Sequence, residues 1–332
     1  MLVREVTENN EKLILSPFAT LSANTKGREV FEEKCDMRTD FQRDRDRIIH
    51  CKSFRRLKHK TQVFLSPESD HYRTRLTHTL EVAQIARTVA RALRLNEDLT
   101  EAIALAHDLG HTPFGHAGER VLNDLVDGGF THFEQGVRVC RVIEKGGKGL
   151  NLTAEVLDGI LNHTRGDWPY TPEGKIVRFS DRIAYINHDI DDAISAGIIT
   201  EETLPSEATD YLGKSKSARI DALVKALVVS SEGADIKMDD TTQKYFDIMH
   251  KFLFESVYTN KTAKSEESKV VNIITGIFEH ILNNPDMLSG EYKEIMERDG
   301  VKRAAADYIA GMTDHFAVTT FENIYIPKFW HI

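Results

Sequence analysis

Apolar residues recur at three- and four-residue spacing along most of this chain, which is the pattern of amphipathic helices rather than strands. The clearest run lies between Arg75 and Leu95, where leucine, isoleucine, valine and alanine return once per helical turn. No proline interrupts residues 68–112, so nothing breaks the helices expected there. Asn96 is placed to cap the helix that follows, which ends near His107.

The same periodicity predicts helices over most of the remaining chain, and strand-like alternation is scarce. The expected ranges are 115–127, 134–144, 155–163, 173–195, 217–231, 240–258, 266–283 and 302–314. Pro172 suits the start of the longest of them. We therefore predict an all-α fold with a helical core and a helical C-terminal extension. The expected division is residues 1–40 as an N-terminal segment packed on the core, 41–200 as the core, and 201–332 as a helical C-terminal part of the same body.

Composition is that of an ordinary globular protein, since 41% of the 332 residues are hydrophobic and 29% are charged. The N-terminus is too charged for a secretory signal, and no apolar run approaches the about 20 residues that span a bilayer. The cysteines form no CxxC pair, which fits a reducing compartment. These cysteines are Cys35, Cys51 and Cys140. We expect a soluble, cytoplasmic protein with no membrane partner.

Charge is unevenly distributed along the chain. The net charge of −9 argues against a general nucleic-acid coat. Residues 42–60 nevertheless contain a block of basic side chains, namely Arg43, Arg45, Arg47, Lys52, Arg55, Arg56, Lys58 and Lys60. Two readings stay open: the block binds a polyanion, or it is a solvated helical face with local ion pairs, which is the commoner case.

The most informative stretch is residues 105–116, which holds three histidines and an aspartate. His107 and Asp108 are adjacent, and adjacent side chains on a helix point in different directions. They can still converge on one ion because Gly110 and Pro113 predict that the helix ends there.

Two more candidate ligands lie on other predicted helices, at His78 and Asp181. We predict that His78, His107, Asp108 and Asp181 bind one divalent metal ion. Nitrogen and oxygen ligands together suit Mn, Fe, Co, Ni or Zn better than Ca, and Mg remains an option through the carboxylates. No cysteine lies nearby in the sequence, so a closed structural zinc site is not expected. An ion that prefers six ligands would keep positions for water and a phosphate oxygen.

A second layer of polar residues accompanies this set. His111 follows His107 by four residues. His116 and Glu119 have helical i,i+3 spacing, so they can form a hydrogen-bonded pair that positions water or moves a proton. On the helix expected at 173–195, one polar face carries Asp181, Tyr185, His188, Asp189 and Asp192.

These residues resemble a known family. The pattern of His78, His107, Asp108 and Asp181 is similar to that of the HD superfamily of metal-dependent phosphohydrolases, and longer strings resemble its dGTP triphosphohydrolase (dGTPase) family. The strings are Phe41–His50, Phe54–Phe64, Asp70–His78, His107–Glu119, His132–Gln135, Glu155–His163, Asp181–Asp189 and Asp307–Asp314. The resemblance implies an HD-domain core and a one-step cleavage of a deoxynucleoside triphosphate at its α-phosphorus. The products would be a deoxynucleoside and inorganic triphosphate.

The resemblance also implies roles for single residues. His111, His116 and Glu119 would transfer protons and position water. Arg75 and Arg182 would hold phosphate oxygens, which suits a triphosphate because it carries roughly four negative charges.

Four further residues are matched to the substrate by the same resemblance. Tyr185 and Asp189 would lie near the sugar and its 3′-hydroxyl, and a tyrosine against C2′ would exclude a ribose hydroxyl. Gln62 would approach the sugar or the base. His132 would face the phosphates, or it would serve only at the start of a helix.

The expected partner is a deoxynucleoside triphosphate, either dGTP or several dNTPs, and the family resemblance implies a homo-oligomer. A regulatory dNTP or single-stranded DNA stays open as a further partner, because residues 201–264 match the family pattern poorly. Two alternatives are kept. One is another HD-type nucleotide phosphohydrolase, a nucleotidase or phosphodiesterase. The other is a dNTP-sensing or single-strand nucleic-acid-binding protein whose metal is structural.

Overall fold

The computed structural model describes residues 1–62, 73–258 and 266–328. The chain divides into two compact units, each built from three stretches. Unit 1 comprises the described residues of 1–49, 78–107 and 152–263, and unit 2 those of 50–77, 108–151 and 264–332. The chain therefore passes from one unit to the other between His107 and Asp108. The sequence-based division at residues 40 and 200 follows the order of the chain and stays a prediction.

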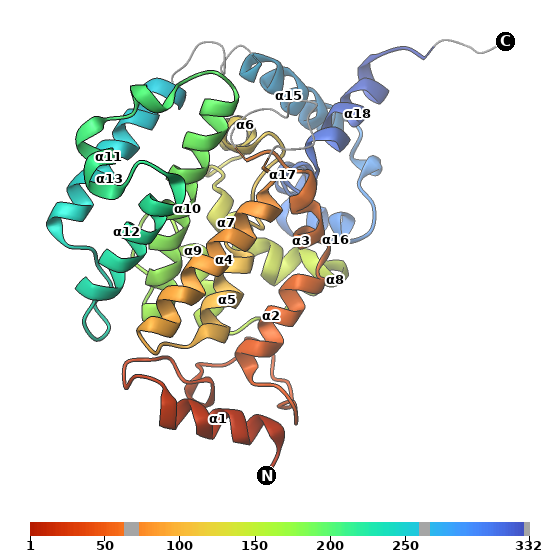
Figure 1. Ribbon diagram of the computed structural model, residues 1–332. Coiled ribbons are helices and arrows are strands. Elements are labelled where there is room, and N and C mark those ends of the chain that lie inside the picture. Colours follow the sequence, from red (N-terminus) through yellow and green to blue (C-terminus); the bar gives the residue numbers. More distant parts are fainter. Residues whose placement is uncertain (63–72, 259–265, 329–332) are drawn as a thin grey trace. The chain divides into compact units, whose positions relative to one another are not determined.

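Unit 1 is a group of helices (Figure 1). Its α-helices are α1 (Val3–Ile14), α2 (Asp40–His50), α4 (Arg75–Ala92), α5 (Glu97–Ala106), α9 (Ala154–Leu161), α10 (Pro172–Ser195), α11 (Ser206–Leu212), α12 (Lys216–Ser230) and α13 (Asp240–Leu253). It also has the 3-10 turns η1 (Ser22–Asn24) and η4 (Glu201–Thr203) and the π-helical segment η5 (Phe254–Tyr258). The last residue of α2 and the first three of α4 are counted with unit 2. Helices α5, α9 and α10 pack against one another, and α10 also contacts α12 and α13.

Helix α5 lies in the core of unit 1, and most of its residues are buried. The side chain of Asn96 caps it by accepting a hydrogen bond from the Leu99 N–H at 3.2 Å, which confirms the predicted cap. On α9, a Cβ at Gly159 would come within 2.6 Å of Ile103 Cδ1, so the glycine allows α9 and α5 to approach closely. This packing fixes the end of α5, where His107 is fully buried.

Helix α10 carries two residues of the candidate site. It begins at Pro172, as predicted, and Thr171 caps it by accepting a hydrogen bond from the Gly174 N–H at 3.1 Å. Asp181 and His188 are two helical turns apart, so both project from one face of α10.

A buried carboxylate fastens the N-terminal part of unit 1. Asp44 on α2 is fully buried and forms an ion pair with Arg28. Its second oxygen accepts hydrogen bonds from the N–H of Thr153 at 2.9 Å and from the Thr153 hydroxyl at 2.7 Å. Arg28 and Thr153 also form an isolated antiparallel β-bridge. One side chain therefore joins α2, the segment before it and the start of α9.

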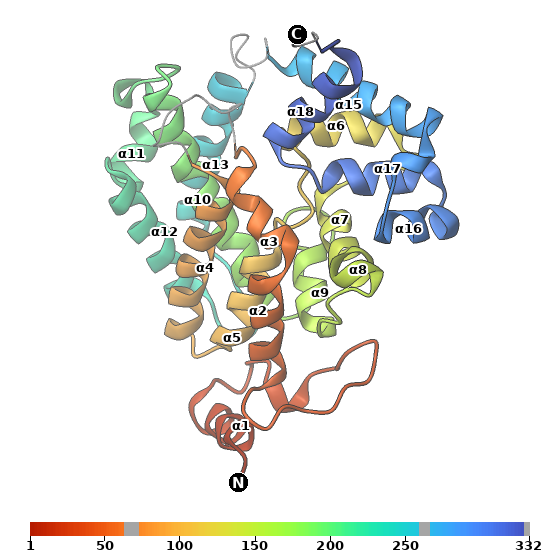
Figure 2. The ribbon, with the colours of Figure 1, turned by 90° about the vertical axis from the view of Figure 1, so that its right-hand side faces the viewer.

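Unit 2 is also helical (Figure 2). Its helices are α3 (Lys52–Arg56), α6 (Gly115–Leu125), α7 (His132–Arg138), α8 (Glu144–Gly147), α15 (Glu267–Asn283), α16 (Glu291–Asp299), α17 (Val301–Ala310) and α18 (Asp314–Tyr325). It also contains the 3-10 turns η2 (Leu57–His59) and η6 (Pro285–Met287) and the π-helical segment η3 (Val139–Ile143). Helix α15 contacts α6, α17 and α18, and α16 packs on α17 and α8.

The loop before α6 carries His111 and is fastened to the C-terminal helices of unit 2. Phe114, the last residue before α6, has a left-handed φ of 63°. Its N–H donates a hydrogen bond to Asp314 Oδ1 at 2.9 Å. The ammonium group of Lys60 donates to the carbonyl oxygens of His111 and Ala310. These partners satisfy backbone groups that an irregular loop cannot pair within itself.

The all-α prediction is confirmed, since the described residues contain isolated β-bridges but no strand. The helices predicted at 115–127, 155–163, 173–195, 217–231 and 266–283 correspond to α6, α9, α10, α12 and α15. The helix predicted at 302–314 is wrong at its C-terminal end. Helix α17 stops at Ala310, and Thr313 caps the separate helix α18.

Two helices predicted as regular are interrupted. The helix expected at 134–144 is α7 followed by the π-helical turn η3, and Lys145 and Gly146 then adopt φ of 54° and 66°. The helix expected at 240–258 passes from α13 into η5 at Phe254. A single π turn barely disturbs the amphipathic period, so the sequence pattern does not reveal it.

The sequence pattern also misses several helices, namely α1, α2, α3, α8, α11, α16 and α18. In α16, for example, only Tyr292 and Ile295 are buried, which is too few apolar positions for a clear period.

No helix in the described ranges has both the length and the apolar character needed to cross a membrane. The three cysteines are all free thiols.

We expect Asp44→Ala to lower the free energy of unfolding by about 3–5 kcal/mol, because it removes the closer of two carboxylates that pair with the Arg28 guanidinium and the buried acceptor of both Thr153 hydrogen bonds. The matched control is Asp46→Ala on the same helix. Asp46 pairs at 2.7 Å with Arg38, whose side chain is 50% exposed, so its loss should change the free energy by less than about 1 kcal/mol. Urea unfolding followed by circular dichroism measures both. Equal losses in the two variants would contradict the anchoring role of Asp44.

Candidate metal centre and acid–base cluster

Three of the four predicted metal ligands converge in unit 1. Asp181 Oδ1 lies 3.1 Å from His78 Nε2 and 3.7 Å from His107 Nε2. The two histidines are buried, whereas the side chain of Asp181 is 18% exposed. The three residues come from α4, the end of α5 and the middle of α10, so the packing of these helices brings them together.

Hydrogen bonds on the far side of each imidazole set its orientation. His107 Nδ1 lies 2.7 Å from the carbonyl oxygen of Ala104, which can only accept, so Nδ1 carries the proton and Nε2 has a lone pair. His78 Nδ1 lies 3.3 Å from His188 Nδ1. His188 Nε2 in turn lies 3.0 Å from Glu81 Oε2. A consistent assignment has His188 donating from Nε2 to Glu81 and accepting at Nδ1 from His78, which leaves a lone pair on His78 Nε2.

This arrangement requires a positive charge. Two imidazole lone pairs and a carboxylate oxygen repel one another unless a proton or a metal ion lies among them. Divalent transition-metal ions bind these ligand types. The chain of contacts from Glu81 through His188 to His78 is the kind of hydrogen-bonded support that metal-binding histidines ordinarily have. The residues present therefore fit a metal centre.

Asp108, the fourth predicted ligand, belongs to unit 2 and directly follows His107 in the chain. Its carboxylate accepts a hydrogen bond from Arg75 Nη1 at 2.9 Å. Its other oxygen lies 3.1 Å from His111 Nε2. Arg75 is only 2% exposed, and its Nε has no hydrogen-bond partner among the described residues. Arg75 thus orients Asp108 and keeps one N–H donor available.

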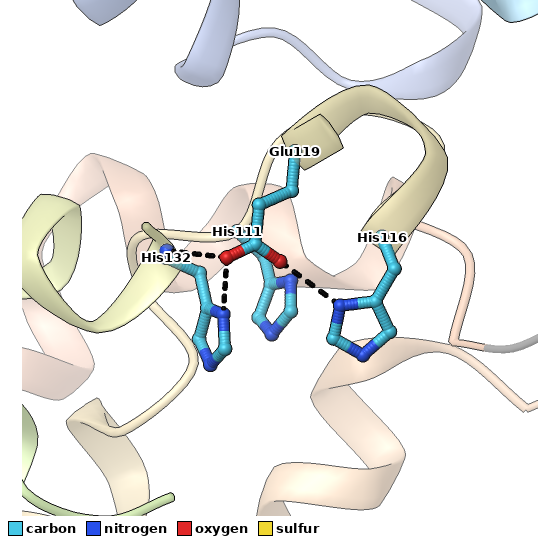
Figure 3. A group of neighbouring side chains, drawn as sticks. All are labelled: His111, His116, Glu119 and His132. Carbon is cyan, nitrogen blue, oxygen red and sulfur yellow. Dashed lines mark hydrogen bonds and ion pairs between the residues drawn. The ribbon is translucent and has the colours of Figure 1, made fainter. Parts of the chain in front are cut away.

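Glu119 is the centre of a histidine cluster in unit 2 (Figure 3). Its Oε2 lies 2.9 Å from His116 Nδ1, which confirms the predicted i,i+3 pair. Its Oε1 accepts a hydrogen bond from the His132 N–H at 2.8 Å and lies 2.8 Å from His132 Nδ1. Burial alone would raise the pKa of Glu119, but the hydrogen bonds from His116 and His132 outweigh it and hold the pKa well below the usual range. Glu119 is therefore an anion at neutral pH.

His111 lies beside this cluster. Its ring stacks on that of His132 with centroids 4.0 Å apart. Burial and the nearby Arg75 guanidinium lower the pKa of His111 well below the ordinary value, so its imidazole is neutral. The structure thus brings together His111, His116, Glu119 and His132, which the sequence analysis placed in two separate groups.

The residues matched to the sugar lie in unit 1. The rings of Tyr185 and Tyr258 stack with centroids 5.9 Å apart. The Tyr258 hydroxyl donates a hydrogen bond to the carboxylate of Asp189, which is buried. Burial is the main cause of the raised pKa of Tyr185, so its hydroxyl stays protonated at neutral pH.

Two further substrate candidates are more exposed. Arg182 is one third exposed and lies 3.5 Å from Asp247. Gln62, in unit 2, has a side-chain oxygen with no hydrogen-bond partner among the described residues. The neighbouring motif residues 63–64 and 70–72 lie outside the described residues.

The basic block at 42–60 is largely engaged in internal contacts. Arg43 and Arg47 both pair with Glu32, and Arg45 pairs with Asp98 at 2.9 Å. At the other end of the block, in unit 2, two basic side chains donate to backbone carbonyl oxygens. The contacts of these residues therefore support the interpretation that they form local ion pairs and hydrogen bonds, and not a polyanion site.

Three residues near the candidate site were not predicted from the sequence. His163 is buried, and its ring centroid lies 5.1 Å from that of His107. Glu81 supports His188, and Tyr258 binds Asp189. Glu81 shares the motif helix with His78 at i,i+3 spacing, which is a usable signal. Tyr258 lies within residues 201–264, which match the family pattern poorly, so no motif marks it.

Comparison with known proteins gives matches over nearly the whole chain. Residues 75–186 match the HD domain, and residues 236–323 match the phosphohydrolase-associated domain. A deoxyguanosinetriphosphate triphosphohydrolase-like protein of Caldanaerobacter subterraneus subsp. tengcongensis is 56% identical over 99% of this chain and 98% of its own length. Proteins of the same description from Clostridium perfringens strain 13 and Geobacter sulfurreducens are 50% and 40% identical, over 99% and 98% of this chain and 99% of their own lengths.

We expect His188→Leu to weaken Mn²⁺ binding about 10–100-fold, because leucine has no acceptor for the His78 Nδ1–H and no donor for Glu81. Titration of free Mn²⁺ by electron paramagnetic resonance measures the dissociation constant. Asp191→Asn is the matched control, since Asp191 on the same helix pairs with Lys216 at 3.1 Å. An unchanged dissociation constant in His188→Leu would contradict the supporting role.

The side chain of Lys60 is almost fully buried. Burial, aided by the nearby Arg56 charge, lowers its pKa from 10.5 to about 7. Between these values the unfolded chain binds more protons than the folded one, so this lysine makes the fold more stable as pH rises from about 7 toward 10.5. Relative to Lys60→Met, the wild type should gain at most about 1.4 kcal/mol of unfolding free energy per pH unit. Urea unfolding at pH 7 and pH 9 tests this, and a constant difference between the two proteins would contradict it.

Proposed function

We propose that this chain, which belongs to the family of deoxyguanosinetriphosphate triphosphohydrolase-like HD-domain proteins, hydrolyses deoxynucleoside triphosphates to a deoxynucleoside and inorganic triphosphate. Membership makes it an HD-type phosphohydrolase with residues able to bind a metal. The substrate class rests on the description that its relatives share. The observation that carries the proposal is the convergence of two imidazole nitrogens on the Asp181 carboxylate.

The proposed ligands of one divalent ion are His78, His107, Asp108 and Asp181. Asp108 is included because it directly follows His107 in the chain and because the family pattern has an aspartate there. Mn and Mg are the first ions to test, and Co, Ni, Fe and Zn also suit the ligand set. Such an ion, when bound, polarises a phosphate oxygen and lowers the pKa of a bound water.

The proposed proton-transfer group is His116. Glu119, an anion, accepts the Nδ1–H of His116 and leaves the Nε2 lone pair on a side chain that is 63% exposed. An imidazole in that state can accept a proton from water and later donate it. His111 is neutral, so it contributes a lone pair or an N–H rather than a charge.

The proposed substrate contacts follow the family resemblance. Arg75 has a buried guanidinium with one N–H without a partner, which suits a phosphate oxygen. Arg182 is the second phosphate candidate. Tyr185, held flat against Tyr258, offers a rigid surface for the sugar, and Asp189 offers a carboxylate for the 3′-hydroxyl. A rigid ring leaves less room for a ribose 2′-hydroxyl than a flexible side chain would.

Gln62 and His132 complete the proposed set. Gln62 has an unpartnered amide oxygen for the sugar or base. His132 and His116 both contact the Glu119 carboxylate. A phosphate bound by His132 would therefore be linked to His116 through Glu119.

The proposed reaction balances with one water. The water oxygen attacks the α-phosphorus, the bond from phosphorus to the 5′-oxygen breaks, and the 5′-oxygen takes a proton. The oxygen of water should therefore appear in the triphosphate and not in the deoxynucleoside.

We expect Mn²⁺ and a dNTP to give deoxynucleoside and intact triphosphate in equal amounts, with ¹⁸O from labelled water in the triphosphate. Anion-exchange chromatography and mass spectrometry identify the products. Stepwise release of orthophosphate would instead indicate another HD-type phosphohydrolase. Binding of dNTP without turnover would indicate a sensing protein.

We expect Asp181→Ala to reduce turnover to background and His116→Ala to lower kcat about 10²–10⁴-fold, since a proton-transfer group contributes that much. The matched control is Glu134→Gln. Glu134 is exposed at the start of α7 and pairs with Thr131, so turnover should be unchanged. Equal losses in His116→Ala and Glu134→Gln would contradict the assigned role.

Location in the cytoplasm, assembly into a homo-oligomer, and regulation by a dNTP or single-stranded DNA stay predictions from the sequence.

A further inference from the structure

The histidine cluster around Glu119 contains the ligand types of a second cation site. His111 lies in the loop before α6, His116 and Glu119 lie on α6, and His132 is the first residue of α7. Each offers one nitrogen or carboxylate oxygen, and these four atoms all lie within 4.8 Å of one another. Figure 3 shows the three imidazole rings gathered below the Glu119 carboxylate.

A buried lone pair in the cluster lacks a partner. His111 Nε2 faces the Asp108 carboxylate at 3.1 Å, so that nitrogen carries the proton and Nδ1 has the lone pair. His111 is 3% exposed, and its Nδ1 has no hydrogen-bond partner among the described residues. A buried acceptor without a donor is destabilising, so a bound cation or another donor there would be stabilising.

We propose that His111, His116, Glu119 and His132 bind a second divalent transition-metal ion, of the Zn²⁺ or Co²⁺ class. Three imidazole nitrogens and one carboxylate oxygen are a ligand set that these ions accept in tetrahedral geometry. The set shares no residue with the proposed centre at His78, His107, Asp108 and Asp181.

Binding would lengthen the contacts of Glu119 only slightly, but the stacked rings of His111 and His132 must also tilt so that both lone pairs point at one ion. Glu119 oxygens lie 2.9 Å from His116 Nδ1 and 2.8 Å from His132 Nδ1. Two ligands on a tetrahedral zinc ion lie about 3.4 Å apart, given bonds of about 2.0–2.1 Å. These two separations would therefore increase by roughly half an ångström, with the His132 backbone N–H still bonded to Glu119 Oε1.

The proton balance is also simple. Without an ion, the Nδ1–H groups of His116 and His132 donate to Glu119. When an ion binds, each of these protons moves to Nε2 of the same ring or is released to water, and Nδ1 becomes a ligand. The exposed edge of the His116 ring gives the ion a route from solvent.

The effect of this second ion on turnover rests on the proposed function. An ion at the cluster occupies Glu119 and His116, the groups that would otherwise transfer a proton. The second site is therefore inhibitory: low concentrations of a transition metal support turnover at the first centre, and higher concentrations suppress it.

The test counts bound metal and does not depend on turnover. Equilibrium dialysis of the metal-free chain against Zn²⁺, with atomic absorption, should give about two ions per chain for the wild type. Co²⁺ should add an absorption spectrum of tetrahedral intensity. His116→Ala, an exposed position, and Glu119→Gln should each bind about one ion and lose that spectrum, while Glu134→Gln should behave as the wild type.

Asp181→Ala separates the two metal centres. One ion retained in Asp181→Ala, with the tetrahedral Co²⁺ spectrum, supports the second site. If Asp181→Ala still binds as many ions as the wild type while Glu119→Gln binds fewer, the proposed first centre fails and the second stands. One ion in the wild type that is lost in Asp181→Ala, or two ions retained in both His116→Ala and Glu119→Gln, would overturn the second site.

Discussion

Two imidazole nitrogens converge on a carboxylate oxygen inside unit 1, and the proposed chemistry depends on the positive charge that this arrangement requires. Because Ala104 and His188 occupy the far nitrogens of His107 and His78, neither ring can turn away without breaking a buried hydrogen bond. Charges interact strongly in a poorly solvated interior, so a cation among these atoms would also stabilise the packing of α4, α5 and α10. The proposed metal centre and the helix core of unit 1 would thus stabilise each other.

The two histidine groups differ in burial, and the difference matches the chemistry assigned to each. His78 and His107 are buried, as suits ligands that hold an ion in one position. His116 is mostly exposed and is fixed only through Glu119, as suits a group that must exchange a proton with water or substrate. The same openness makes the second group accessible to an ion from solvent.

Much of the fold could be predicted from the sequence because helical periodicity is a local property. Helices α5, α6 and α10 begin where Asn96, Gly115 and Pro172 indicate. The errors at η3 and η5 arise because a π turn changes the backbone more than it changes the apolar period. The His116–Glu119 pair was also predictable, since i,i+3 neighbours on a helix meet whatever the tertiary packing.

The sequence alone determined the all-α class, the candidate ligand residues and the family resemblance, because these depend on residue types and short spacings. Only the tertiary structure decided which nitrogen of His107 and of His111 carries the lone pair, that Arg43, Arg45 and Arg47 are paired internally, and that Lys60 is buried. It also added His163, Glu81 and Tyr258 to the surroundings of the site. The physical reason is that protonation, ion pairing and burial are set by neighbours in space, which lie on helices far apart in the chain.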